Sequence, residues 1–95
     1  MEELKPFRAQ IDELDRKIMA LLGERFDVVR QVASIKSEHG IPTYIPARVE
    51  EVKSHCEELA RQHNVDPVII RVVYTILINH ACDLEERLIA EKQAS

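Results

Sequence analysis

The chain has little that breaks a helix or builds a hairpin. Its 95 residues include two glycines, four prolines and no tryptophan. Long segments therefore run without a turn signal, and none shows the alternation of apolar and polar residues that is typical of a strand. The 45% share of hydrophobic residues excludes a disordered chain. We expect one all-α domain covering residues 1–95, built from three helices.

Cysteine is also scarce. Cys56 and Cys82 match neither a CxxC pair nor a set of zinc ligands, so reduced thiols are expected. The net charge of −4, with acidic residues among the basic ones, argues against nucleic-acid binding. The apolar stretch 68–78 contains Arg71 and Thr75 and is too short to span a bilayer. We expect a cytoplasmic protein that binds neither nucleic acid nor membrane.

The few breakers predict where the helices begin and end. Gly40 can close the first helix in the left-handed conformation. Pro46 suits the first turn of a second helix, and Asp66 followed by Pro67 is a typical start for a third. The expected helices cover residues 3–39, 46–62 and 66–91.

One arginine interrupts the apolar stripe of the first helix. The stripe consists of Leu4, Phe7, Ile11, Leu14, Ile18, Leu21, Val28, Val32 and Ile35. Arg25 occupies the position where the next apolar residue would fall, and Lys36 lies about three turns later, near the same face. Because an unpaired buried charge is strongly unfavourable, both cations predict an anionic partner. That partner is either a carboxylate of the protein or a small polyanionic ligand.

The first helix is too long for the chain that carries it. Some 35 residues make a helix about 50 Å long, which exceeds the diameter of a compact domain of this size. A second copy could cover the stripe in an intertwined six-helix homodimer, whereas a monomer would leave it exposed. Arg8 precedes Lys36 by 28 residues, or about 42 Å of helix. Only an antiparallel partner helix could therefore bring an Arg8 to the ligand of Lys36.

The run from Phe7 to Ile18, then Leu21-Leu22-Gly23-Glu24-Arg25, then Lys36, resembles the all-helical chorismate mutases. The resemblance implies the type II chorismate mutase fold, with two sites per homodimer that each rearrange chorismate to prephenate without a cofactor or a metal. By position, it implies that Arg25 and the partner's Arg8 hold the substrate carboxylates. Lys36 would bond the ether oxygen and one carboxylate. The same scaffold also serves isochorismate pyruvate lyases and aminodeoxychorismate mutases.

The residue types suit a pericyclic rearrangement. Such a reaction needs neither a nucleophile nor a proton carrier. It needs the substrate held in a reactive conformer, with cations where negative charge builds on the ether oxygen. The chain shows no Ser-His-Asp, metal-ligand or phosphate-loop pattern. This absence is consistent with an enzyme of that kind.

The second helix departs from the family pattern. Where the family often has an aspartate, this chain has Ile45, and alignment on Arg48, an expected substrate ligand, puts Val49 where a glutamate binds the substrate hydroxyl. Isochorismate pyruvate lyases have a similar Arg-Val pair. Formation of salicylate and pyruvate from isochorismate, or mutation of an amino-substituted chorismate, therefore stays open, as does a binding module without turnover. A shift of one residue would bring Glu50 to the ligand instead of Val49.

Glu85 interrupts the apolar seam of the third helix, one turn after Ala81, and both are expected to face the substrate. The resemblance places Glu85 at a family glutamine that donates a hydrogen bond to the ether oxygen. An ionised carboxylate cannot donate, so Glu85 would have to be protonated in the active complex. Activity should then fall as the pH rises. The alternative interpretation is an interior ion pair with Arg25 or Lys36.

Overall fold

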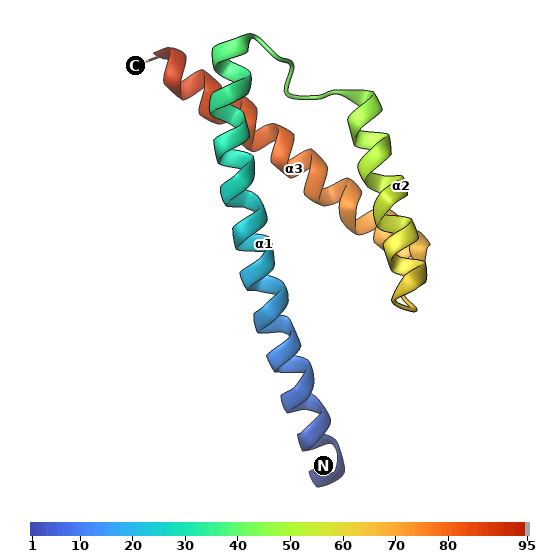
Figure 1. The fold of residues 1–95 in the computed structure, drawn as a ribbon. Coiled ribbons are helices and arrows are strands. Elements are labelled where there is room, and N and C mark those ends of the chain that lie inside the picture. Colours follow the sequence, from blue (N-terminus) through green and yellow to red (C-terminus); the bar gives the residue numbers. More distant parts are fainter. Residues whose placement is uncertain (95) are drawn as a thin grey trace.

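The structure, a computed structural model, describes residues 1–94. Within this range the elements are a 3-10 turn, η1 (Glu2–Leu4), and three α-helices. The α-helices are α1 (Lys5–His39), α2 (Pro46–Gln62) and α3 (Pro67–Ala94), and Figure 1 shows their arrangement. No strand occurs among the described residues. The predicted all-α class with three helices is therefore confirmed, and α3 extends three residues beyond its predicted end.

The predicted breakers act at the ends of α1 and α3. Gly40 has a φ of +63° and ends α1 in the left-handed region that glycine adopts without steric cost. The backbone N–H of Ile41 then donates to the carbonyl of Lys36 at 2.9 Å. At the start of α3, the Asp66 carboxylate accepts a hydrogen bond from the backbone N–H of Val68 at 2.9 Å. Each bond satisfies a backbone group that the end of a helix would leave unpaired.

α3 is the central helix of the fold. α1 and α2 each pack against α3, and within residues 1–94 they do not pack against each other. Figure 1 shows α2 beside the first half of α3, while the last part of α1 crosses the second half of α3. The ring of Phe26 on α1 meets that of His80 edge-on, with centroids 5.3 Å apart. The small core consists of Ala33, Val49, Cys56, Ala60, Ile78, Ala81 and Leu84, with the charged Glu85 among them.

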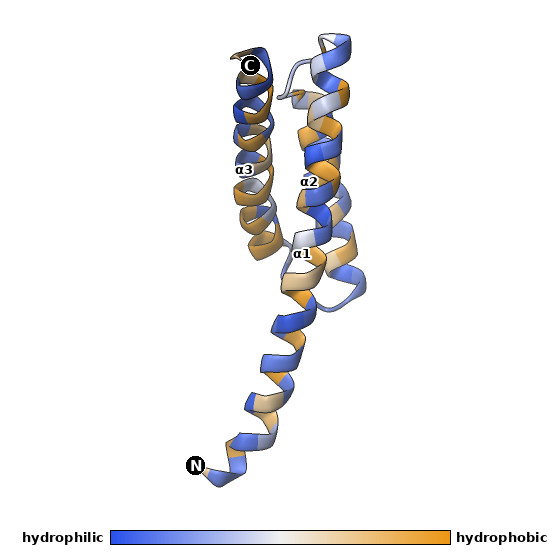
Figure 2. Ribbon diagram, turned by 90° about the vertical axis from the view of Figure 1, so that its left-hand side faces the viewer, coloured by the Kyte–Doolittle hydropathy of each residue, from blue (hydrophilic) through white to orange (hydrophobic). Residues whose placement is uncertain are grey.

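The first half of α1 projects beyond the other helices (Figures 1 and 2). The radius of gyration is 17.0 Å, compared with about 12 Å for a compact chain of this length. Phe7, Ile11 and Leu14 on this segment are 61%, 57% and 55% exposed. A single chain therefore leaves the apolar stripe of α1 uncovered.

α3 also carries an uncovered apolar face near its start. Its exposed members are Val68, Ile69, Val72, Val73 and Ile76. By length and composition alone α3 could cross a membrane, a test that the core helix of a soluble protein also passes. The apolar stretch 68–78 is only part of α3, which runs from Pro67 to Ala94. Two apolar faces, one on α1 and one on α3, thus lack a covering surface.

Candidate active site

A pocket of about 160 Å³ lies where the three helices and the loop between α1 and α2 meet. It is lined by Arg25, Val29 and Lys36 of α1, Thr43 and Ile45 of the loop, Arg48, Val49 and Val52 of α2, and Ile78, Ala81, Cys82 and Glu85 of α3. Every residue predicted to face the substrate is in this lining except Arg8. Three segments that are distant in sequence therefore converge on one small cavity.

Arg25 reaches this pocket with its hydrogen-bonding capacity unused. Its Nη1 atom is buried and has no hydrogen-bond partner among the described residues. The guanidinium carbon lies 5.6 Å from the ring centroid of Tyr74 on α3, a cation–π contact. Burial, and then the neighbouring Cys56, raise the pKa of Tyr74, against the opposing charge of Arg25. The neutral ring thus supports the guanidinium without pairing its charge, and an anion in the pocket would supply the missing partner.

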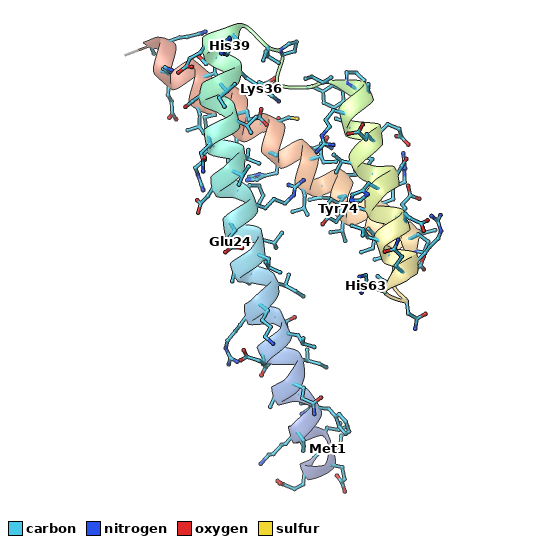
Figure 3. The ribbon with its side chains drawn as sticks, in the orientation of Figure 1. Met1, Glu24, Lys36, His39, His63 and Tyr74 are labelled. Atoms are coloured by element: carbon cyan, nitrogen blue, oxygen red, sulfur yellow. The ribbon has the colours of Figure 1, made fainter. Side chains whose placement is uncertain are left out.

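Lys36 and Glu85 form a buried ion pair across the pocket. The Lys36 Nζ atom lies 2.7 Å from Glu85 Oε1, and the two side chains are only 15% and 6% exposed. Figure 3 shows Lys36 on the part of α1 that crosses α3. The Nζ atom donates a hydrogen bond to the Thr43 carbonyl at 2.9 Å. Glu85 Oε1 has no aligned hydrogen-bond partner among residues 1–94, despite the short distance to the ammonium. The carboxyl oxygen is therefore paired in charge but still open to a hydrogen bond from or to a ligand.

The two interpretations of Glu85 turn out to be compatible. The interior ion pair exists, and its cation is Lys36 and not Arg25. Both members of the pair also line the pocket. A structural pairing in the empty protein and a role toward a ligand are thus available to the same two groups.

Val49 and Glu50, neighbours on α2, have different surroundings in the structure. Val49 is buried and lines the cavity. Glu50 instead accepts a hydrogen bond from Arg71 of α3 at 2.6 Å, and this guanidinium holds the pKa of the Glu50 carboxyl below its usual range. Arg48 lines the pocket and forms an ion pair with Glu51. The wall contributed by α2 is therefore apolar apart from Arg48, and Glu50 does not belong to it.

Arg8 is the predicted ligand that the pocket lacks. It is exposed on the projecting half of α1. It precedes Arg25 by 17 residues, which is roughly 25 Å along the helix. Within one chain, Arg8 cannot contact a molecule bound between Lys36 and Arg25.

The structure adds pocket residues that the sequence did not single out. Thr43 lies in the loop between α1 and α2, where no periodicity exists to mark it. Cys82 was expected only as a reduced thiol, yet it lines the pocket one turn from Glu86. Burial raises the pKa of the Cys82 thiol, so it stays protonated and is a poor nucleophile near neutral pH. The groups in the pocket are thus suited to holding charge in place more than to forming a covalent intermediate.

The matching family model agrees with this arrangement. The model for chorismate mutase type II matches residues 7–86. The chain belongs to the type II chorismate mutase family. The resemblance seen in the sequence is confirmed, and the matched segment includes every residue that lines the pocket.

Curated relatives place the match along nearly the whole chain. A protein named chorismate mutase from Methanocaldococcus jannaschii is 37% identical over 93 residues, which cover 98% of this chain and 94% of that protein. A protein named 4-amino-4-deoxychorismate mutase from Streptomyces venezuelae is 30% identical over 90 residues, or 95% of this chain and 87% of that protein. A T-protein from Haemophilus influenzae is 46% identical over 48 residues, only 13% of its own length. Similar sequence therefore occurs both in proteins of this size and within a much larger one.

Proposed function

We propose that this enzyme is a chorismate mutase that rearranges chorismate to prephenate without a cofactor. The observation that carries the proposal is the buried and unpartnered Nη1 of Arg25, which shares a pocket with the buried Lys36–Glu85 pair. The family to which the chain belongs and the name of the Methanocaldococcus relative support it. A dicarboxylate with an ether oxygen between its carboxylates would pair with Arg25 and with the partner's Arg8, and its oxygen would lie near Lys36 and Glu85.

The reaction breaks the ether C–O bond and forms a C–C bond within one molecule, so no group enters or leaves. Arg25 binds a substrate carboxylate with its planar fork and fixes the reactive conformer. Lys36 places a point charge at the ether oxygen, where negative charge develops as the bond breaks. Protonated Glu85 donates a second hydrogen bond to that oxygen. The apolar side chains of Val49 and Ile78 limit the water around these groups, which strengthens their electrostatic effect.

We propose further that the enzyme works as an intertwined homodimer with sites shared between subunits. The uncovered apolar faces of α1 and α3 support this, since a soluble monomer rarely exposes so much contiguous apolar surface. The position of Arg8, exposed on the projecting half of α1 and far from Lys36, also supports this proposal. An antiparallel partner would cover the stripe and bring its Arg8 to the second carboxylate.

A complementation experiment tests the shared site. Arg8→Ala and Arg25→Ala subunits should each be inactive alone, because every site of either homodimer lacks one cation. After unfolding together and refolding at equal amounts, half of the dimers are mixed and each has one intact site. Activity should return to about a quarter of the wild-type value. No recovery, with mixed dimers shown by native mass spectrometry, would contradict a shared site.

A second candidate is the mutation of a 4-amino-substituted chorismate or the elimination of pyruvate from isochorismate. It is favoured by Val49, which puts an apolar side chain in the wall that α2 contributes. The name of the Streptomyces venezuelae relative also favours the amino-substituted substrate. No carboxylate of α2 lines the pocket to bind a ring hydroxyl.

Product analysis separates these reactions. Purified enzyme is incubated with chorismate, 4-amino-4-deoxychorismate and isochorismate in separate reactions. Prephenate from chorismate supports the proposed function, and the amino-substituted product or salicylate with pyruvate supports the second candidate. No turnover of any of the three would refute both and leave a binding module.

A further inference from the structure

Thr43 connects the loop between α1 and α2 to α1 and to α3. Its carbonyl accepts hydrogen bonds from Lys36 Nζ on α1 at 2.9 Å and from Cys82 Sγ on α3 at 3.5 Å. Its hydroxyl Oγ1 donates to Glu86 Oε1 on α3 at 3.0 Å. Cys82 and Glu86 are four residues apart, so they lie on one face of α3. Thr43 is thus bonded to two residues on one face of α3, and its carbonyl also accepts a bond from Lys36.

The bonds of Thr43 determine where the Lys36 ammonium points. The ammonium has three N–H donors on a flexible stem. One N–H goes to the Thr43 carbonyl, and the short ion pair directs the group toward Glu85. With the bond to Thr43 in place, the other N–H groups remain available to Glu85 and the substrate. Without the Thr43 carbonyl, the attraction of the buried Glu85 carboxylate would draw the ammonium out of this shared position.

The side chain of Thr43 is what fixes its carbonyl. Pro42 restrains the backbone of the loop on one side only, and Thr43 is the loop residue whose hydroxyl reaches α3. Burial raises the pKa of the Cys82 thiol, so it keeps the proton that it donates to the same carbonyl. The carbonyl therefore has both lone pairs engaged, and its position depends on the contacts that α3 makes with this residue.

We propose that Thr43 is a positioning residue for catalysis, which orients Lys36 through its backbone carbonyl and is itself anchored by its hydroxyl to Glu86. This inference rests on the proposed function, because it assigns Lys36 to the substrate. It predicts that the chemical step slows when a hydroxyl is removed whose bonding partner, Glu86, lies outside the pocket lining. It also predicts that substrate binding, which depends on the arginines, changes little.

The test compares Thr43→Val, which keeps the shape and loses the hydroxyl, with Thr43→Ser, which keeps the hydroxyl. Thr43→Val should lower kcat about five- to tenfold, the loss expected for one misplaced hydrogen bond to the reacting oxygen, with KM within about twofold. Thr43→Ser should restore most of the turnover. Glu86→Met should reproduce the effect of Thr43→Val, and the double variant should be no slower than either, because both changes break one bond.

Two outcomes would overturn the proposal. One is wild-type kcat in Thr43→Val, and the other is an equal loss in the valine and serine variants, which would indicate a purely structural role. A second measurement does not depend on turnover. Acylation of Lys36 by an amine-specific reagent, mapped by mass spectrometry with exposed Lys5 as the reference, should be faster in Thr43→Val than in Thr43→Ser.

This second measurement separates the two proposals. If the wild-type enzyme leaves chorismate unchanged, the proposed function fails, while the acylation rates still decide whether Thr43 fixes Lys36. If the enzyme is active and the acylation rates of the two variants agree, the role of Thr43 fails and the proposed function stands.

Discussion

Glu85→Gln is the substitution that bears most directly on the chemistry of the pocket. Glutamine has the shape of glutamate and always carries an N–H donor, so it can bond the ether oxygen at any pH. In the wild-type enzyme the same bond requires a protonated carboxyl. In the empty site the Lys36 ammonium lies 2.7 Å from this carboxyl. The rates of the two enzymes should therefore respond differently to pH.

Both the pH dependence of kcat and the free energy of unfolding should differ between the wild-type enzyme and Glu85→Gln. Above the pH at which Glu85 loses its proton in the substrate complex, the wild-type kcat should fall about tenfold for each pH unit. The Glu85→Gln kcat should stay flat over the same range. Removing one member of a fully buried ion pair typically lowers the free energy of unfolding by about 3–5 kcal/mol. The cost here should be nearer about 1–3 kcal/mol, because Lys36 keeps its bond to the Thr43 carbonyl and its side chain is 15% exposed.

The assay follows the loss of chorismate absorbance from about pH 5 to pH 9 for both enzymes. Urea unfolding of each variant confirms that the compared proteins are folded at every pH. Other ionisable groups, among them Arg25 and Cys82, also line the pocket and could affect the pH profile. Cys82 would lose its proton only at high pH, since burial and then the charge of Glu85 raise its pKa. A wild-type profile that is flat, and that Glu85→Gln leaves unchanged, would refute a protonated Glu85.

Two further predictions concern stability. Asp66→Ala removes the side-chain acceptor for the Val68 N–H and should lower the free energy of unfolding by about 1 kcal/mol, whereas Asp66→Asn, which keeps an acceptor oxygen, should lose much less, as measured by urea unfolding. Glu50→Gln tests the bond to Arg71 by its pH dependence. Because Arg71 holds the folded pKa of Glu50 below the unfolded value, the pair stabilises the fold above the unfolded pKa, and this contribution is lost as the pH falls through the folded pKa. The wild-type protein should therefore exceed Glu50→Gln in stability near pH 7 and approach it near pH 3, and a constant difference at the two pH values would contradict the assignment.

The helices could be predicted because their signals are local. Gly40 and Asp66 end and begin helices through contacts with residues at most a few positions away. The apolar stripe of α1, with Arg25 and Lys36 on the same side, follows from helical geometry alone. These features required no knowledge of where α2 or α3 lies.

The rest of the site depends on contacts between distant segments. Val49 lines the pocket, whereas Glu50 bonds Arg71 of α3, which follows it by 21 residues. In the same way, the choice of Lys36 over Arg25 as the partner of Glu85 depends on how α1 crosses α3. The sequence shows which charged residues are present. The packing of the helices determines which of them form ion pairs.

The contact between Thr43 and Glu86 is another that the sequence could not predict. A threonine in a loop has no periodicity to place it, and a glutamate in a helix, such as Glu86, most simply faces solvent. Their hydrogen bond joins positions 43 residues apart and exists only because the loop folds back over α3. Local pattern could not have indicated it.

Because half of α1 is uncovered in a single chain, the stability of the fold should depend on the protein concentration. In the proposed dimer, the helix that shields the partner's apolar stripe also delivers Arg8 to the partner's site. Unfolding then releases two chains, so each tenfold rise in protein concentration adds about 1.4 kcal/mol to the stability of the dimer. On dilution, helix content and activity should be lost over the same concentration range, because one segment of the chain supports both.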